Sequence, residues 1–346
     1  MTYMKPNYFK LYVGEMLSLI MITFACISWQ APAVLLESDS KGNNPIYLAD
    51  PTIFFHDGTY YLYGTGGHNA NQGFQVYTST DMHAWEGHKG AHGGYALRKE
   101  DVYGDKGFWA PQVFQYQDKF YMAYTANENI AIAMSDSPLG PFTQASKTPL
   151  AAPVRQIDPF VFIDEDGKKY LYHVRLTEGN RIFVAEMEDD LSGIKPETLQ
   201  EIITAEAGWE NTANADWPVA EGPSVLKHNK LYYLFYAAND FRNPDYAVGY
   251  AVSDTPFGPW RKYSGNPILS KATTGENGSG HGDFTIGNQG QLYYVFHTHY
   301  STNRVGPRKA AVVKARFKAP PQQSYAEDQL VMDAESFYFL QAEKEM

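Results

Sequence analysis

One short pattern occurs five times along this 346-residue chain, and it constrains the fold more than any other feature of the sequence. Each copy has a polar or aromatic residue, a small residue or Asp, then in four copies a proline, an apolar run, a turn and an aromatic run. The copies start near Ala49, Trp109, Ile157, Glu221 and His281. In the last copy we align Asp283 with the proline of the others. A further β-like run follows each copy, as in "NIAIAMSDSP" and "YAVGYAVSDTP".

Repeated units of this kind cannot each bury a core alone, so they must pack on one another. Recurrence at roughly 40 to 50 residues is typical of propeller blades, and the wider spacing here leaves room for loops. The repeat therefore predicts an all-β fold, a five-bladed β-propeller in one domain over residues 43–318. A β-sandwich built from hairpins is the alternative, but it does not predict the same motif at every first strand.

Composition agrees with many short strands joined by turns, since the chain has 26 tyrosines, 29 glycines and 20 prolines. Trp85 and Trp260 lie in partial copies of one motif, "STDMHAWE" and "SDTPFGPWRK", and we assign both to blade packing. Pro320 and Pro321 end the last strand-like run. Residues 319–346 are expected to form an irregular or partly helical tail outside the propeller.

The formal net charge of -11 argues against a nucleic acid or an anionic membrane as the partner, because clustered Lys and Arg hold such partners. A neutral substrate fits better, and no protein partner is implied. Cys26 is the only cysteine, so the chain can form no intramolecular disulfide and no multi-thiolate metal site.

Residues 1–26 have the pattern of a signal peptide, because Lys5 and Lys10 precede the apolar run "MLSLIMITFAC", although Glu15 departs from it. Cys26 ends this run as the last residue of a loose lipoprotein cleavage site; the alternative is a buried or discarded cysteine. We therefore expect export in a bacterium, to the periplasm or to the outer surface as a lipoprotein.

The start of each repeat carries the residues with chemical potential. In a propeller, the innermost strand of every blade begins at one common mouth, so equivalent repeat positions surround one pocket. Asp50, Asp158, Glu221, His281 and Trp109 would meet there. A single Asp before a strand is more often a turn-forming or solvated residue. Three carboxylates at matched positions favour a shared site, because a turn requirement would make all five positions alike.

Carboxylates without a thiol, a nucleophile motif or a phosphate loop are typical of glycosidic bond cleavage. One carboxylic acid protonates the leaving oxygen, and a second carboxylate activates water or attacks the sugar. A third carboxylate can raise the pKa of the acid. Trp109 and nearby tyrosines would suit the C–H faces of sugar rings, although such aromatics are more often core residues.

The chain resembles glycoside hydrolase family 43, whose members are five-bladed propellers that act on α-L-arabinofuranosides and β-D-xylosides. The stretches that carry the resemblance are "ADPTIFF", "WAPQV", "IDPFVF", "EGPSV" and "GHGDF". The resemblance implies inversion of configuration, with Asp50 as general base, Glu221 as general acid and Asp158 tuning Glu221. Inversion would place the acid and the base roughly 6.5 to 9.5 Å apart, which leaves space for a water.

The resemblance also implies roles for three basic residues. His281 matches the family histidine near a central metal, commonly calcium, for which we expect water to supply most ligands. Arg308 matches an arginine that reaches the sugar or the catalytic carboxylates; the alternative is a surface charge. His297 and His299, in "HTHY", are either substrate contacts or ordinary strand residues, and we assign His297 to substrate binding. No organic cofactor is expected.

The expected function is an exo-acting α-L-arabinofuranosidase that removes side chains from plant cell-wall polysaccharide, so the partner is an oligosaccharide or polysaccharide containing arabinose or xylose. Alternatives within the same class are a β-D-xylosidase, an exo-β-galactanase and an endo-arabinanase. A non-catalytic sugar-binding propeller is a further alternative, but both the acid and the base are present. Sialidase-like and fructan-cleaving propellers fit less well, because their motifs are incomplete or missing.

Overall fold

The computed structural model describes residues 44–67, 69–206, 208–319 and 327–343. The predicted signal peptide and Cys26 lie outside these residues. All of the described residues belong to one compact unit. Within the described part, no helix combines the length and the apolar character that crossing a membrane requires.

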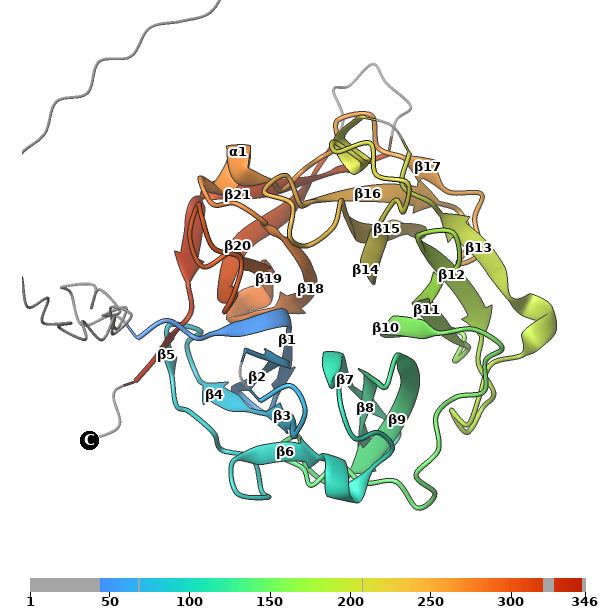
Figure 1. Ribbon diagram of the computed structural model, residues 1–346, viewed down its shortest axis with the longest axis vertical. Helices are drawn as coiled ribbons and strands as arrows, with labels where there is room; N and C mark the ends of the chain where they lie inside the picture. Colours follow the sequence, from blue (N-terminus) through green and yellow to red (C-terminus); the bar gives the residue numbers. More distant parts are fainter. Residues whose placement is uncertain (1–43, 68, 207, 320–326, 344–346) are drawn as a thin grey trace, which may run out of the picture. The chain divides into compact units, whose positions relative to one another are not determined.

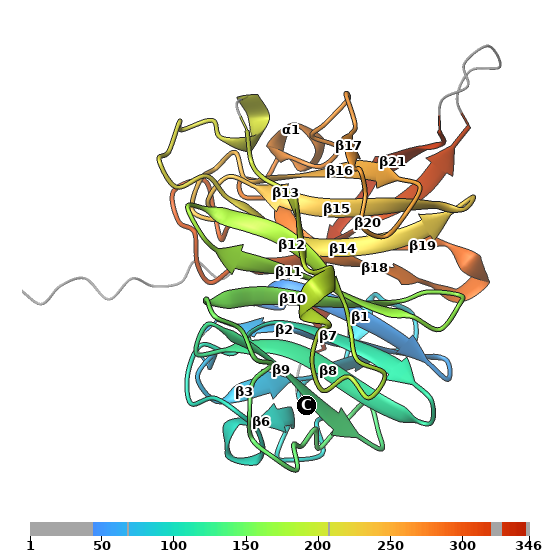
Figure 2. The ribbon, with the colours of Figure 1, turned by 90° about the vertical axis from the view of Figure 1, so that its right-hand side faces the viewer.

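The described chain is almost entirely β-structure, and five sheets surround a central axis as propeller blades (Figure 1). The prediction of a five-bladed β-propeller is confirmed. Blade 1 consists of β1 (Leu48–His56), β2 (Thr59–Gly66) and β4 (Tyr77–Ser79). Blade 2 consists of β7 (Trp109–Tyr116), β8 (Lys119–Ala126) and β9 (Asn129–Ser135). Blade 3 consists of β10 (Gln156–Ile163), β11 (Lys169–Leu176), β12 (Asn180–Glu186) and β13 (Gln200–Ile203). Blade 4 consists of β14 (Ala220–His228), β15 (Leu231–Ala238), β16 (Ala247–Ser253) and β17 (Arg261–Lys262). Blade 5 consists of β18 (Gly280–Ile286), β19 (Leu292–Thr298), β20 (Lys309–Lys318) and β21 (Gln329–Phe339). Viewed from the side, blade 3 lies between blades 2 and 4 (Figure 2).

Short elements connect and close these sheets. The pair β3 (Gly73–Gln75) and β6 (Tyr95–Arg98) follows blade 1, and β5 (Ala84–Trp85) pairs in parallel with β22 (Gln341–Ala342). The remaining elements are one short α-helix, α1 (Lys271–Thr274), and the 3₁₀ helices Lys99–Asp101, Pro196–Thr198, Gly208–Glu210 and Asn288–Gly290.

The end of the chain belongs to the propeller, so the prediction of an irregular or partly helical tail is wrong for residues 327–343. Strand β21 is the outer strand of blade 5, and β22 joins blade 1 through β5. The regular pairing of β21 with β20 is interrupted between Asp333 and Tyr338, where Ser336 Oγ accepts the N–H of Lys314 at 2.8 Å. This interruption explains why the sequence pattern did not indicate a strand.

Aromatic and aliphatic side chains pack in the interfaces between neighbouring blades, so many strands are buried on both faces. Every residue of β16 is buried, for example. Trp85 is fully buried in the cluster that joins blades 5 and 1, and Trp260 packs edge-on to Tyr172. Both positions agree with the predicted packing role. These contacts make the inner strands a rigid base for the residues at their ends.

All five innermost strands have a β-bulge at the same place, just after their first residues. One residue of each bulge has a positive φ between 45° and 59°, in the left-handed region. These five residues are Asp50, Ala110, Asp158, Gly222 and His281. The fifth repeat is therefore offset by one residue from our alignment, because Gly282 and not Asp283 takes the position of the proline. A Cβ at Gly282 would lie 1.8 Å from the carbonyl oxygen of Val295, which excludes any larger residue.

A side chain of one blade accepts the bulge N–H of the next blade in three places. Thr65 Oγ1 accepts the N–H of Ala110 at 3.0 Å, and Thr125 Oγ1 accepts the N–H of Asp158 at 3.0 Å. His297 Nδ1 accepts the N–H of Asp50 at 3.1 Å. Thr65, Thr125 and His297 occupy the same position of the second strand, opposite the residue that precedes the bulge. The repeat thus fixes both the strand end and the group that supports it.

Candidate active site

A cavity of about 430 Å³ lies where the innermost strands begin, and the three predicted carboxylates meet in its wall. Trp109, Ile157, Leu176, Trp217, Val219 and Phe241 give it apolar walls, as expected for a site that takes a sugar ring. Its polar and charged wall is formed by Asp50, Asp158, Glu221, His281, Arg308, Glu128, Asn180, Asp240 and Arg242.

Asp50 is buried and surrounded by groups that stabilise its charge. Its Oδ1 lies 3.0 Å from Arg308 Nη1 and 3.4 Å from His281 Nδ1, and Thr65 Oγ1 donates to its Oδ2 at 2.7 Å. Burial alone would raise the pKa of Asp50, but the guanidinium of Arg308 and the hydrogen bond from Thr65 hold it well below its usual value. Asp50 is therefore ionised at all ordinary pH values, as a general base requires.

Glu221 precedes the bulge of β14 by one residue, so its side chain starts one position earlier than those of Asp50 and Asp158. Tyr246 Oη donates to its Oε1 at 2.8 Å, and Asn180 Nδ2 donates to its Oε2 at 2.8 Å. Burial raises the pKa of Glu221 to about 7; both hydrogen bonds oppose the rise, and the charge of Asp50 adds to it. A carboxyl with this pKa keeps its proton near neutral pH and can act as an acid.

Asp158 is affected by the charges of both other carboxyls. Burial, Glu221 and Asp50 together raise its pKa well above the usual value. Its Oδ2 accepts the backbone N–H of Gly222 at 3.2 Å, which ties Asp158 to the residue next to Glu221. The environment thus separates the three carboxyls into one that is ionised and two that share a tendency to hold a proton. Such a separation is the usual basis of acid and base roles.

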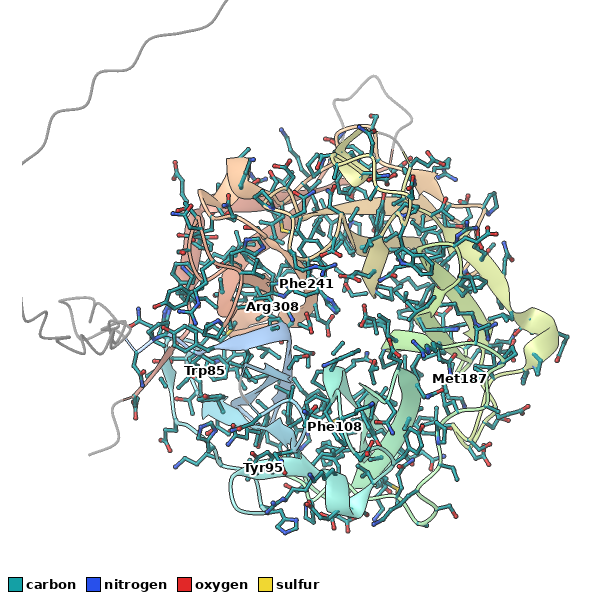
Figure 3. The ribbon with its side chains drawn as sticks, viewed as in Figure 1. Trp85, Tyr95, Phe108, Met187, Phe241 and Arg308 are labelled. Carbon is teal, nitrogen blue, oxygen red and sulfur yellow. The ribbon has the colours of Figure 1, made fainter. Side chains whose placement is uncertain are left out.

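Arg308 and Phe241 lie beside each other near the centre of the ring of blades (Figure 3). The guanidinium carbon of Arg308 is 4.7 Å from the centre of the Phe241 ring. This stacking fixes the guanidinium while its Nη1 pairs with Asp50. The sequence left two interpretations of Arg308 open, a contact with the catalytic carboxylates or a surface charge. The structure places Arg308 in the cavity wall, at a carboxylate.

His297 does not line the cavity, so its predicted substrate contact is corrected to a supporting role. Its side chain is fully buried beneath Asp50 and stacks on Tyr246 at 5.7 Å. Burial and the nearby Arg308 charge hold its pKa well below the usual value, so the imidazole is neutral. The residue therefore holds Asp50 in place from behind. His299 is buried as well and contacts the carbonyl oxygen of Phe241 at 2.8 Å.

His281 lies between the cavity and a small hollow of about 30 Å³ on the propeller axis. Its Nδ1 faces Asp50 at 3.4 Å and Asp158 Oδ2 at 3.8 Å. Gly222 leaves room for the ring, because a Cβ there would approach it to 2.7 Å. Burial lowers the pKa of His281, so the ring is neutral and one nitrogen keeps its lone pair.

The residues around this hollow fit a cation only with water as the main ligand. Among the described residues, no three His, Cys, Asp or Glu side chains gather as a metal-binding group. Ser224, directly after Pro223 of the hollow, has a buried hydroxyl without a described partner. A hard cation such as calcium, held by few protein atoms and several waters, agrees with this set.

Four residues that support the site were not found from the sequence. Thr65 and Tyr246 hold the base and the acid, and Asn180 joins the acid to Trp217, whose Nε1 donates to Asn180 Oδ1 at 2.9 Å. Asn180 is the first residue of β12, and Trp217 lies in the connection before β14, so both lie outside the repeat motif of the first strands. Thr65 could have been found, because Thr125 has the same place in the next repeat.

Fold and site together define a class: a five-bladed propeller with an ionised carboxylate and a protonated one in a single sugar-sized cavity is the arrangement of a glycoside hydrolase. Comparison with protein families gives the same result. Residues 43–319 match the family model described as glycosyl hydrolases family 43, and the chain belongs to this family.

Known proteins that are similar to this chain have several different activities. The crystal structure of an endo-1,4-beta-xylanase from Bacteroides thetaiotaomicron VPI-5482 is 42% identical and has a TM-score of 0.79, covering 88% of this chain and 99% of that one. The beta-D-galactofuranosidase xynD of Aspergillus niger is 24% identical over 76% of this chain and 78% of its own. The xylosidase/arabinosidase 43A of Humicola insolens is 28% identical over 66% and 83%. Hydrolysis of glycosides is common to all three.

Proposed function

We propose that this protein is an inverting glycoside hydrolase that releases α-L-arabinofuranosyl units from plant cell-wall polysaccharide. The observation that carries the mechanism is the opposite environment of two carboxyls in one cavity, with the pKa of Asp50 lowered and that of Glu221 raised. The arabinose assignment draws on relatives named for arabinose release, such as the xylosidase/arabinosidase of Humicola insolens.

In the proposed reaction, Asp50 takes a proton from a water that attacks the anomeric carbon. Glu221 gives its proton to the glycosidic oxygen as the bond from that oxygen to the anomeric carbon breaks. The water oxygen becomes the new hydroxyl on the opposite face of the sugar, and proton exchange with solvent restores both carboxyls. Arg308 and Thr65 hold Asp50 ionised. Burial and the charge of Asp50 keep the pKa of Glu221 high, and Asp158 holds the backbone beside Glu221 through the N–H of Gly222.

A second candidate is action on β-1,4-xylan, which the 42% identical endo-1,4-beta-xylanase structure favours. Linkage choice depends on loops around the cavity, which differ among relatives of one fold. A panel of aryl α-L-arabinofuranoside, aryl β-D-xyloside, arabinoxylan and xylan separates the candidates by the product released. Proton NMR of the first product gives the stereochemistry, and retention of configuration would contradict the assigned roles.

A calcium ion on the propeller axis, near His281, is a separate part of the proposal. Its effect would be electrostatic and structural, since it would place a positive charge below the carboxylates. The test is thermal unfolding with calcium and with a chelator. We expect calcium to raise the melting temperature of the native protein and not that of His281→Ala; equal melting with and without metal would contradict the proposal.

Export is also proposed, on the sequence of residues 1–26 alone. A polymeric substrate outside the cell agrees with it. Cell fractionation of the native protein and of Cys26→Ala is the test. Release of the variant from a membrane-bound to a soluble exported form would support a lipid anchor on Cys26, and an unchanged location would argue against it.

A further inference from the structure

The catalytic cavity continues into a second hollow of about 330 Å³. Both share Trp217, Val219, Asp240 and Arg242 in their walls, and the second extends to Asn211 and Asn243. The catalytic roles proposed above account for the first space only. The continuity of the two walls makes the second hollow an extension of the same groove.

The second hollow lies on the acid side of the site. Trp217 donates to Asn180, and Asn180 donates to Glu221, so a single side chain separates Trp217 from the acid. Asp50 contacts other groups, namely Arg308, His281 and Thr65. Because the acid protonates the leaving oxygen, the part of the substrate that leaves must extend from the Glu221 side.

Trp217 presents an aromatic surface to this groove. It is 49% exposed and is one of few large apolar side chains in the described chain with so much exposure. Its only polar atom is already paired with Asn180, so the exposed part is apolar ring. An exposed aromatic ring beside a polar groove is suited to the C–H face of a sugar.

The loop that carries Trp217 is firmly held, so the groove is present before any ligand binds. The buried Asn239 accepts the N–H and the hydroxyl of Thr212 at 2.8 and 3.0 Å and donates to the carbonyl oxygen of Trp209 at 2.7 Å. The buried Glu210 accepts from Tyr236 Oη at 2.6 Å and from Lys262 Nζ at 2.8 Å.

Charge in the groove is balanced internally. Arg242 Nε and Nη2 donate to the two carboxylate oxygens of Asp240 at 2.7 and 2.5 Å. This pair offers polar atoms without a net charge, and Asn211 and Asn243 are neutral. The groove therefore suits a neutral glycan better than an anionic ligand.

We propose that this groove binds the leaving-group side of the substrate, with a sugar of the polysaccharide main chain stacked on Trp217. The inference rests on the proposed glycosidase function and extends it, because it makes an oligosaccharide or polymer a better substrate than a simple glycoside. The leaving sugar would contribute binding energy through Trp217 at the moment when Glu221 protonates its oxygen.

The test compares two substrates with equally poor leaving groups: the methyl glycoside and an arabinoxylo-oligosaccharide that carries the same terminal sugar. Both need the acid to a similar degree, so their ratio of kcat/KM reports the contact with the leaving sugar. We expect Trp217→Ala to lower this ratio about tenfold, near the upper end of what one aromatic stacking contact contributes. Trp217→Phe keeps the ring and loses the bond to Asn180, so its ratio should stay within about threefold of the native one.

An equal loss on both substrates, or a loss as large in Trp217→Phe as in Trp217→Ala, would overturn the proposal and assign Trp217 to support of Asn180. Ile286→Ala is the matched control, since Ile286 is 59% exposed at the far end of β18. Calorimetric titration with the same oligosaccharide separates the two proposals. If the native protein cleaves nothing, the proposed function fails, while weaker binding by Trp217→Ala still supports the groove and unchanged binding overturns it.

Discussion

At the scale of single residues, two carboxyls of almost the same chemistry have opposite properties because their neighbours differ. Asp50 contacts an arginine and a hydroxyl, whereas Glu221 is buried among neutral donors near other carboxyls. The sequence repeat located both, together with Asp158, because their positions depend on strand ends. It did not provide Asn180 and Tyr246, because these residues lie at or just before the third strands of their blades, outside the motif of the first strands.

The pH dependence of the reaction follows from these environments. Glu221 must be protonated, so kcat/KM should fall as pH rises through about 7, the pKa of its carboxyl. Asp50 must be ionised, and its low pKa keeps the base active far into the acid range. A pH profile of kcat/KM on an unactivated oligosaccharide measures both limits. For Glu221→Gln with an activated aryl glycoside, the alkaline limit should disappear; its persistence would show that another group titrates.

Ionisation of the buried Glu221 should also lower the free energy of unfolding at high pH. Its pKa is higher in the folded protein, about 7, than the usual value of about 4.5 for a glutamate, so the folded state favours the neutral carboxyl. Its contribution is complete below the unfolded pKa and is lost as pH rises through about 7, for a total of about 3 kcal/mol. In thermal melts, the melting temperature of Glu221→Gln relative to that of the native protein should therefore be higher at pH 8 than at pH 4. An equal difference in melting temperature at both pH values would contradict the raised pKa.

Replacing Asp158 should move the alkaline limit. Burial and then Glu221 raise the pKa of Asp158, and repulsion between two ionised carboxylates is mutual. Asp158→Asn can never carry a charge, so we expect it to lower the pKa of Glu221. The alkaline limb of kcat/KM should shift to lower pH, with a loss of rate near pH 7. A fall in rate with no shift of the limb would assign Asp158 to positioning alone, through its bond to Gly222.

At the scale of strands, the five bulges position the site, and sequence reasoning could not foresee them. The prolines marked where each first strand begins, but the left-handed residue next to them depends on pairing with the neighbouring strand. The one-residue offset in the fifth repeat follows from this limit, because Gly282 replaces the proline that would have fixed the alignment.

Thr65 and Thr125 provide a matched pair of substitutions at this scale. Each accepts a buried bulge N–H, so Thr65→Val and Thr125→Val should each destabilise the fold by about 1 to 3 kcal/mol. Only Thr65 also donates to Asp50. Thr65→Val should therefore raise the pKa of Asp50 and move the acid limb of kcat/KM to higher pH, while Thr125→Val leaves this limb in place. Denaturant melts and pH profiles measure the two effects, and equal shifts of the acid limb would contradict the role of Thr65.

At the scale of the whole propeller, the ends of the described chain close the ring. The N–H of Ile46 donates to Leu340, and Leu340 donates to Ala310 in blade 5. The repeat predicted five blades correctly, but the closing strands gave no signal because they do not copy the motif. Leu340 is fully buried, so Leu340→Ala should cost about 2 to 5 kcal/mol. Glu335→Ala, at an exposed position of β21, is the control for denaturant melts, and an equally small effect of both would show that closure is dispensable.

Closure also decides when the base acquires its environment. The counter-ion of Asp50, Arg308, lies 258 residues later in the chain, and the imidazole behind Asp50 lies 247 residues later. Both partners belong to blade 5, so Asp50 meets them only when that blade has packed against blade 1. Catalytic competence is therefore tied to assembly of the whole ring, and no subset of blades contains a complete general base.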